Sequence, residues 1–336
     1  MSSNFASRCA ARAWWNRRVT SRLVRTALLA ADQQAAVLAL VAAAHEEDGI
    51  VPMSEQALLA ARGRSGRAVE HVLAYADGDL AGYLQLDEAT GTGSAELVVA
   101  PAHRRRGVGS HLLRQLPAGS RVWAHGDLKA AERFAAANGL EVVRELWVLG
   151  RRFDEAGPLE EPVLPDGLVA RSFRPGRDED EWLRVNAAAF ASHAEQGQMT
   201  RADLDARMEE SWFDPDGLIL VVPEAEPATV AASHWTKIPT EGPRRAHASG
   251  EGREASRGRS GEVYVVAVDP AYQGKGLGKP VTLLGLRYLR EQGVADVILY
   301  VDGDNPAALK VYRGLGFTTR SVDRMFAQTG QHIDGS

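Results

Sequence analysis

Short apolar runs bounded by polar turn residues occur in the same order in both halves of the chain. In the first half we predict strands at Val69–Ala74 and Leu80–Leu86, joined by the turn Asp77–Asp79, and a third strand at Ala95–Ala100. The glycine in that turn tolerates the positive φ that a tight hairpin needs. Helices are predicted over Ala31–Ala44, from Ser54 to Ala61 and through His111–Leu116.

The second half repeats this alternation of strands and helices. Strands are predicted at Leu168–Phe173, Leu218–Val222, Val230–Lys237, Glu262–Val268 and Val297–Val301, and helices around Asp180–Phe190, around Arg201–Trp212 and from Leu277. Strands that alternate with helices in this way predict the α/β class, in the broad sense that includes α+β folds.

A segment rich in proline and acidic residues, Arg151–Gly167, separates the two halves. We interpret residues 151–166 as a linker between domains. The chain then consists of a first domain at residues 21–150 and a second domain at residues 167–328, with a basic, disordered extension at residues 1–20 and a tail at residues 329–336. The total length of 336 residues agrees with this division, because one domain takes roughly 150 residues.

The composition is that of a soluble, folded protein, with 45% hydrophobic, 25% charged and 7% aromatic residues. Lys and Arg total 39 and Asp and Glu total 44, so the formal net charge is 39 − 44 = −5. This mild acidic balance argues against nucleic acid or an anionic membrane as the partner. We therefore expect a small-molecule partner.

The cysteine content and the apolar runs point to a cytoplasmic protein. Cys9 is the single cysteine, so an intramolecular disulfide is excluded, which agrees with a reducing compartment. The run Ala35–Ala44 has ten residues, well below the ~18 that suggest a membrane-spanning helix. The sequence shows no His, Cys and carboxylate spacing that supports a metal site.

Two segments are rich in arginine. The first 31 residues carry six Arg residues and no acidic residue before Asp32, a composition that can resemble an organelle transit peptide; we interpret it as an untethered extension. Gly242–Gly261 contains five Arg residues among Gly and Ser. It lacks the interleaved aromatic residues of nucleic-acid-binding segments, so we predict a solvated loop.

Comparing the halves reveals an internal repeat. Four pairs of residues are each separated by 169 positions: Pro101 and Pro270, Arg104 and Gln273, Gly107 and Gly276, Gly109 and Gly278. Farther on, Asn138–Leu140 matches Leu315–Phe317 at a separation of 177 positions. We conclude that the chain is a tandem duplication.

The repeated element places a strand, a proline, an Arg or Gln and two closely spaced glycines before a helix. The first backbone N–H groups of a helix have no partner within it and can bind phosphate oxygens. The P-loop motif is excluded because Gln273 and Pro280 replace its first glycine and its hydroxyl residue. The dinucleotide fingerprint is excluded because Leu112 and Val281 replace its third glycine. A glycine-rich turn with a purely structural purpose remains the alternative.

The segment Gln273–Gly278, which follows the strand ending at Val268, resembles the pyrophosphate-binding motif of the GNAT acetyltransferase superfamily, and Arg104–Gly109 resembles it in the first half. The resemblance implies acetyl-CoA as cosubstrate and two GNAT-like domains, each a mixed, mainly antiparallel sheet flanked by helices on both faces. It implies cofactor-binding roles for Leu97, Val98, Val99, Arg104, Arg105, Arg106, Gly107, Val108, Gly109, Val266, Ala267, Val268, Gln273, Gly274, Lys275, Gly276, Leu277, Gly278, Lys279, Asn305, Pro306, Ala307, Ala308, Leu309 and Lys310.

A wider set of segments, spread over about residues 20–328, is similar to the mycothiol synthase family: Asp48–Gly49, His193–Gly197, His234–Lys237, Gly261–Val266 and Tyr300–Asn305. This similarity implies transfer of an acetyl group from acetyl-CoA to the cysteinyl amine of desacetylmycothiol, a hydroxyl-rich inositol glycoside, in the last step of mycothiol biosynthesis. It implies acceptor contacts from Asp48, Glu195, Lys237, Glu262 and Tyr300. Singly, each of these residues could instead serve only the surface or the core.

The residue types suggest how such a transfer proceeds. Glu262, at the head of the strand before the loop, is the candidate general base acting through water, since an α-amine with a pKa of roughly 7.7 to 8.0 needs only a modest base. Backbone N–H groups around Val268 would stabilise the oxyanion. Tyr312 is the candidate acid for the departing thiolate, although its reference pKa makes proton donation uphill by about 2 kcal/mol.

The duplication offers a comparison between the two halves. Glu262 corresponds to Gly93 at the separation of 169, and Tyr312 corresponds to Ala135 at the separation of 177. We therefore predict that the second domain is catalytic and that the first is catalytically degenerate.

Two alternatives stay open at this stage. The chain could acetylate another amine, such as an aminoglycoside, a polyamine or a protein N-terminus, or it could be an acyl-CoA-sensing module without turnover. The presence of both Glu262 and Tyr312 argues against the sensor. In each case we expect a monomer with no nucleic-acid or membrane partner and no metal.

Overall fold

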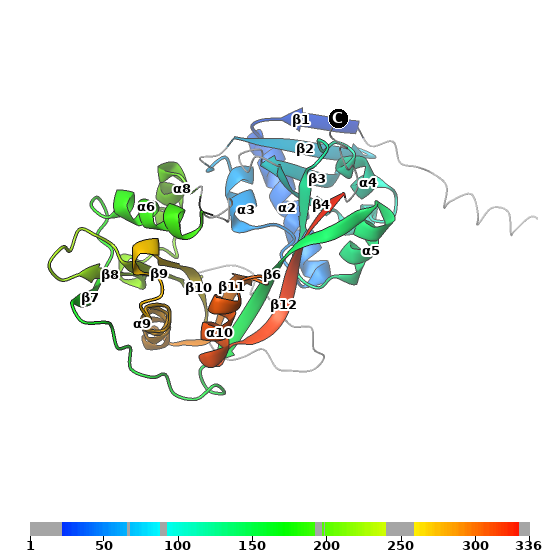
Figure 1. Ribbon diagram of the computed structural model, residues 1–336. Helices are drawn as coiled ribbons and strands as arrows, with labels where there is room; N and C mark the ends of the chain where they lie inside the picture. The colour runs from blue at the N-terminus through cyan, green and yellow to red at the C-terminus, as the bar shows by residue number, and fades with distance from the viewer. Residues whose placement is uncertain are drawn as a thin grey trace, which may run out of the picture. The chain divides into compact units, whose positions relative to one another are not determined.

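The computed structural model describes residues 22–65, 68–87, 93–191, 197, 199–239 and 259–328 (Figure 1). The predicted extension, the predicted tail, Cys9, Glu195 and most of the predicted loop Gly242–Gly261 lie outside these residues. The chain divides into two compact units. The first unit comprises Met1–Gly63, Ala68–Glu141 and Phe326–Ser336, and the second comprises Arg64–Arg67 and Val142–Met325.

The first unit is built on five strands in the order β1-β2-β3-β4-β5. The strands are β1 (Arg22–Thr26), β2 (Val69–Ala76), β3 (Asp79–Asp87), β4 (Ser94–Val99) and β5 (Arg121–Ala124), and the helices are α2 (Ala31–Asp48), α3 (Glu55–Ala61), α4 (Val108–Leu113) and α5 (Lys129–Ala137). Neighbouring strands are antiparallel except for β4 and β5, which are parallel. The turn predicted at Asp77–Asp79 joins β2 to β3, with both Asp77 and Gly78 at positive φ.

Side chains of this sheet alternate between two cores. Leu73 and Val98 pack with α2 and α3 on one face, whereas Val72 and Ala95 pack with α4 on the other. Helix α3 begins where the sequence predicted, because the Ser54 hydroxyl accepts a hydrogen bond from Ala57 N at 3.2 Å. The sheet therefore has helices on both faces.

Seven of the described strands lie wholly or mostly in the second unit, in the order β12-β6-β11-β10-β9-β8-β7. They are β6 (Leu140–Arg152), β7 (Leu168–Ser172), β8 (Leu218–Pro223), β9 (Ala232–Lys237), β10 (Arg259–Val268), β11 (Val294–Asp302) and β12 (Thr318–Gln328). The helices are α6 (Glu179–Ala189), α8 (Arg201–Met208), α9 (Gly278–Glu291) and α10 (Pro306–Gly314). Strands β10 and β11 are parallel, while β10 is antiparallel to β9 and β11 is antiparallel to β6.

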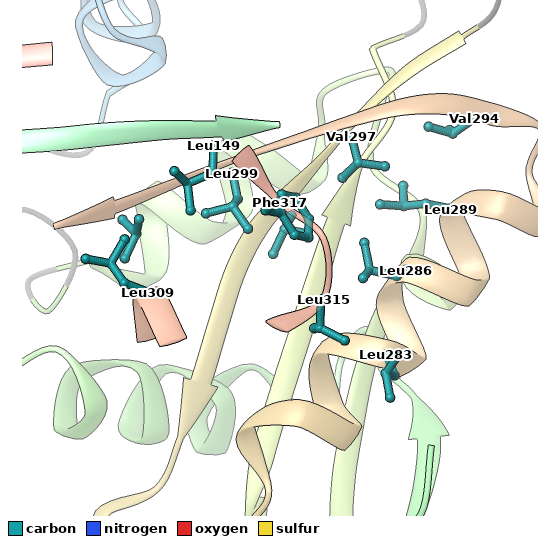
Figure 2. Packing of buried hydrophobic residues seen from close by; sticks show 12 residues of the cluster. Leu149, Leu283, Leu286, Leu289, Val294, Val297, Leu299, Leu309, Leu315 and Phe317 are labelled. Carbon is teal, nitrogen blue, oxygen red and sulfur yellow. The ribbon is translucent and has the colours of Figure 1, made fainter. Parts of the chain in front are cut away.

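Two cores again lie on opposite faces of the sheet. Helices α6 and α8 cover one face with a cluster that includes Trp182, Leu204 and Trp235. Helices α9 and α10 cover the other face (Figure 1), where the leucines of α9 belong to the same buried cluster as Phe317, Leu149 and Leu299 (Figure 2). The mixed, mainly antiparallel sheet flanked by helices confirms the predicted fold class in both units.

The segment expected to be a linker makes specific contacts inside the second unit. Arg151 and Arg152 belong to β6, and the buried Arg151 guanidinium donates to Leu315 O at 2.6 Å and to Gly157 O at 2.8 Å. Farther along, Glu160 pairs with Lys279 of α9. Residues 142–152 therefore belong by their contacts to the second unit, whereas the sequence placed residues up to 150 in the first domain.

Candidate active site

The second unit carries the glycine-rich loop between β10 and α9. A short 3-10 turn, η5 (Pro270–Tyr272), leads into two glycines with left-handed backbone, Gly274 at φ 75° and Gly276 at φ 80°. Helix α9 begins at Gly278, and its N-cap residue, Leu277, makes no side-chain cap hydrogen bond. The first N–H groups of α9 therefore remain for an anion, the arrangement that suits phosphate oxygens.

The first unit repeats this loop with a strained residue in it. The 3-10 turn η3 (Pro101–His103) precedes Arg105 at φ 62° and Gly107 at φ 86°. Arg105 stands where the second loop has Gly274, and a left-handed conformation costs a residue with a Cβ atom about 1 kcal/mol. The two loops thus share the two left-handed positions, and only the second loop has glycine at both of them.

A further contact is repeated between the two loops. Gln273 Nε2 donates to Val268 O at 3.2 Å, and Arg104 Nε donates to Val99 O at 3.2 Å. Both pairs keep the separation of 169 residues, since 273 − 104 and 268 − 99 each equal 169. In each unit this side chain ties the loop to the last residue of the strand before it.

Arg104 also forms an ion pair with Asp48, the last residue of α2. Its two terminal nitrogens donate to the two carboxylate oxygens of Asp48 at 2.7 Å each. This contact raises the pKa of Arg104. The structure therefore joins a residue predicted to contact the acceptor with one predicted to bind the cofactor.

The parallel strands separate just before each loop. The ladder between β10 and β11 ends at Val263 and Leu299, although β10 continues to Val268. The β4–β5 ladder likewise ends at Glu96 and Trp123. Val266–Val268 lie beyond the end of the β10–β11 ladder. The backbone edge of these residues that faces β11 can therefore bind an extended ligand by strand-like hydrogen bonds.

A β-bulge at Tyr264 determines which side chains of β10 face each way. Val263 packs in the core under α9, whereas Val265 packs in the core under α6 and α8. Residues two apart on a regular strand share one face of the sheet, but Val263 and Val265 face opposite sides because the register with β9 shifts between them. Glu262 precedes the bulge and lies directly opposite Lys237 of β9, so both side chains lie on the α6 and α8 face.

Lys237 is held between two aromatic rings on that face. Its Nζ atom lies 4.6 Å from the centre of the Trp212 ring and 5.0 Å from that of Tyr264. The Tyr264 hydroxyl accepts a hydrogen bond from Arg207 Nε at 2.7 Å. Sequence reasoning missed Trp212, Tyr264 and Arg207, because only the pairing of distant segments brings them together.

Tyr300 shares the face that carries Glu262. Val297, Leu299 and Val301 of β11 lie in the core under α9 and α10, so the alternation of the strand turns Tyr300 to the other side. The structure thus brings three of the predicted acceptor contacts, Lys237, Glu262 and Tyr300, to one face of three adjacent strands.

Tyr312 lies on α10 in the same unit. Its ring packs edge-on against Phe317 with centroids 5.9 Å apart, and burial raises the pKa of its hydroxyl to about 12. The preceding residue, Val311, approaches Gly278, where a Cβ atom would lie 3.8 Å from its side chain. Helix α10 therefore contacts the start of α9, next to the glycine-rich loop.

Several residues predicted to bind the cofactor have structural contacts of their own. Asn305 accepts a hydrogen bond from Ala308 N at 3.0 Å and caps α10, and Lys279 pairs with Glu160. Side chains in hydrophobic cores belong to Val98, Val108, Ala267, Leu277 and Leu309. At these five positions only the backbone can face a ligand.

The described part of the chain contains no group of three or more His, Cys, Asp and Glu side chains placed to hold a metal ion. Its helices include none that is long and apolar enough to cross a bilayer.

Known proteins resemble this chain over most of its length. The acetyltransferase (GNAT) family matches residues 184–317, and an acetyltransferase (GNAT) domain matches residues 68–141. The mycothiol acetyltransferase of Thermobispora bispora is 47% identical over 87% of this chain and 95% of its own, and that of Nocardia farcinica is 47% identical over 88% and 94%.

Among solved structures, a tandem GNAT protein from the clavulanic acid biosynthesis pathway has a TM-score of 0.65 at 19% identity, covering 91% of this chain and 97% of its own. That likeness shows the fold, and the sequence relatives show the family. The chain carries two GNAT domains and belongs to the mycothiol acetyltransferase family.

Proposed function

We propose that the chain transfers the acetyl group of acetyl-CoA to the cysteinyl amine of desacetylmycothiol. The observation that carries this proposal is the arrangement of the second unit. There the strand that bears Glu262 separates from its parallel neighbour and leads directly into a glycine-rich loop at an uncapped helix N-terminus. Family membership supports the same acceptor.

The second unit offers backbone groups that support binding of acetyl-CoA. Gly274, Gly276 and the first N–H groups of α9 would hold the pyrophosphate, and the open edge of Val266–Val268 would hold the pantetheine amides. When bound, the cosubstrate supplies an activated acetyl group. The protein's own part is to orient that group and to move protons at the amine and the sulfur.

Glu262 is the proposed general base. It lies on the same face as Lys237 and Tyr300, where the acceptor would bind. An α-amine with a pKa of roughly 7.7 to 8.0 is partly protonated at neutral pH, so a carboxylate acting through one water suffices to free its lone pair.

Tyr312 is the proposed acid for the departing thiolate. Its hydroxyl is protonated at neutral pH, as an ordinary tyrosine hydroxyl is, and burial raises its pKa further, to about 12. Full proton transfer to a thiolate with a reference pKa of about 8.5 is uphill by roughly 5 kcal/mol. Its contribution therefore begins as a hydrogen bond donated to the sulfur while the C–S bond breaks.

Catalysis is assigned to the second unit alone. The first unit has Gly93 and Ala135 where the second has Glu262 and Tyr312. Its loop also contains the strained Arg105. We propose that Asp48 contacts the acceptor, and that the protein works as a cytoplasmic monomer.

Release of free CoA from acetyl-CoA tests this proposal. The purified chain is incubated with desacetylmycothiol and, separately, with an aminoglycoside, a polyamine and a peptide bearing a free N-terminus. Release with desacetylmycothiol alone is the expected result. Release only with the other amines would assign a different acceptor, and binding of acetyl-CoA without release in any reaction would assign a sensor.

A further inference from the structure

The site contains a lysine whose position depends on residues outside the predicted acceptor set. Lys237 is the last residue of β9, and a lysine side chain in that position can adopt many rotamers. Here its ammonium group lies over Trp212 and Tyr264 at 4.6 and 5.0 Å. Both distances are within the ~6 Å at which a cation is attracted to the face of an aromatic ring.

The two rings are themselves held by a larger aromatic cluster. Their centroids are 5.1 Å apart, and Trp235 lies 5.1 Å from Tyr264 and 5.7 Å from Trp212. The β-bulge places Tyr264 in this cluster together with Val265. The ring faces that contact Lys237 therefore cannot turn without disturbing the core under α6 and α8.

Arg207 connects this cluster to α8. Its side chain is nearly inaccessible, with 6% relative exposure, yet it carries a charge that burial would penalise unless its donors were used. Nε donates to the Tyr264 hydroxyl at 2.7 Å, and Nη1 donates to Asp203 O at 2.8 Å. A buried arginine thus fixes the tilt of the tyrosine ring beneath the lysine.

We propose that Trp212, Tyr264 and Arg207 act as positioning residues that hold the Lys237 ammonium beside Glu262, and that this unit sets the affinity for the hydroxyl-rich amine acceptor. The inference rests on the proposed function of the site. Lys237 and Glu262 are direct cross-strand neighbours, so fixing the lysine determines where its three N–H donors meet the acceptor's hydroxyl oxygens.

The central test is a double-mutant cycle between Trp212→Leu and Lys237→Met. Each single change is expected to raise the KM for desacetylmycothiol about tenfold, while the KM for acetyl-CoA stays within twofold. The double variant is expected to match the singles, because Trp212 acts through Lys237. A merely structural role of Trp212 would instead give effects that multiply.

Matched variants separate ring loss from general destabilisation. Trp212→Phe retains an aromatic face and is expected to restore most of the affinity for the acceptor. Phe213→Leu is the control, because Phe213 packs against Trp235 in the same core and belongs to none of the proposed contacts. Tyr264→Phe removes only the hydrogen bond with Arg207 and is expected to raise the acceptor KM threefold or more.

The outcomes distinguish this inference from the proposed function. If the wild-type protein does not acetylate desacetylmycothiol, the proposed function itself is wrong. An active wild type whose acceptor KM is unchanged in Trp212→Leu, or rises equally for acetyl-CoA, overturns the positioning role alone. If Trp212→Leu yields no folded protein, Tyr264→Phe decides, and an unchanged acceptor KM in that variant overturns the inference.

Discussion

Asp48 at the end of α2 accepts two parallel hydrogen bonds from Arg104, each 2.7 Å long. Arg104 Nε also donates a hydrogen bond to Val99 O, and Gln273 makes the corresponding hydrogen bond to Val268 O in the second loop. The amide of Gln273 carries no charge and cannot form an ion pair. The ion pair is therefore a feature of the first loop alone, added to a contact that both loops have.

We expect this pair to stabilise the first unit. In a cycle of Asp48→Asn and Arg104→Gln, urea unfolding should give a coupling free energy of roughly 1 kcal/mol, because the pair is bidentate and largely shielded from water. Arg104→Gln reproduces the residue of the second loop. Asp48→Asn with Arg106→Gln is the control cycle and should couple by no more than a few tenths of a kcal/mol. Equal coupling in both cycles would contradict a specific pair.

Helix α9 approaches β9 closely at Gly285. A Cβ atom there would overlap the imidazole of the buried His234. We expect Gly285→Ala to lower the free energy of unfolding by about 2 kcal/mol, since a packed core has no room for an added methyl. Gly314→Ala is the control, because no atom lies within 4 Å of its Cβ position. Two variants of equal stability would refute the close approach.

His234 should make stability depend on pH. Burial lowers the pKa of its imidazole to about 4 in the folded protein, while its Nδ1 lies 3.0 Å from Val281 O. The unfolded chain, with an ordinary histidine pKa near 6.5, binds a proton that the folded chain does not. His234 therefore does not lower the free energy of unfolding above pH 6.5, and this free energy falls as the pH drops from 6.5 towards 4.

Denaturant unfolding of the wild type and His234→Gln isolates this effect. Between pH 7 and pH 5 the wild type should lose about 2 kcal/mol more stability than the variant. His71 also has a lowered pKa, but it is present in both proteins and cancels in the difference. Parallel pH curves for the two proteins would show that His234 keeps an ordinary pKa.

The acidic segment before β7 pairs with residues of α9. Glu160 lies 2.7 Å from Lys279 and Glu161 lies 2.6 Å from Arg287. Lys279 adjoins the glycine-rich loop, so we expect Glu160 to compete for its charge with the phosphates of a bound acetyl-CoA. We expect Glu160→Gln to lower the KM for acetyl-CoA about two- to threefold, as suits an exposed pair. Glu161→Gln is the control and should leave the KM for acetyl-CoA nearly constant. A rise in that KM for Glu160→Gln would argue against competition between Glu160 and the phosphates.

Much of the fold could be predicted because it is encoded locally. Apolar runs that end at turn residues predict β2, β3, β8 and β9. Two closely spaced glycines before a helix predict the loop in each half. Strands β6 and β12 were missed because charged residues interrupt their apolar pattern. Those charges pair across strands, as Arg144 does with Asp302 at 2.6 Å and Arg324 with Glu145 at 3.1 Å. Such pairing cannot be seen in one strand alone.

The sequence suggests candidate residues for the site but not the geometry that the structure gives them. Glu262, Lys237 and Tyr300 could be placed on strands from the sequence. Their common face depends on the β-bulge at Tyr264 and on the register of β9 with β10. The positions of Trp212 and Arg207 depend on how α8 and the segment after it pack on that face, which no local pattern encodes.

Of the two similar glycine-rich loops, we propose that only the loop of the second unit serves catalysis. Gly107 and Gly276 form a matched pair, with φ of 86° and 80° and no atom within 4 Å of a Cβ at either position. A glutamate at either site therefore causes similar backbone strain and places a negative charge where a phosphate would bind.

Turnover of acetyl-CoA with desacetylmycothiol by Gly276→Glu, Gly107→Glu and Glu262→Gln tests this claim most directly. We predict that kcat/KM falls at least a hundredfold in Gly276→Glu and in Glu262→Gln, as expected for loss of the cosubstrate site or of a general base, and less than tenfold in Gly107→Glu. Turnover retained by Glu262→Gln and Gly276→Glu but lost in Gly107→Glu would contradict the account and move the chemistry to the first unit.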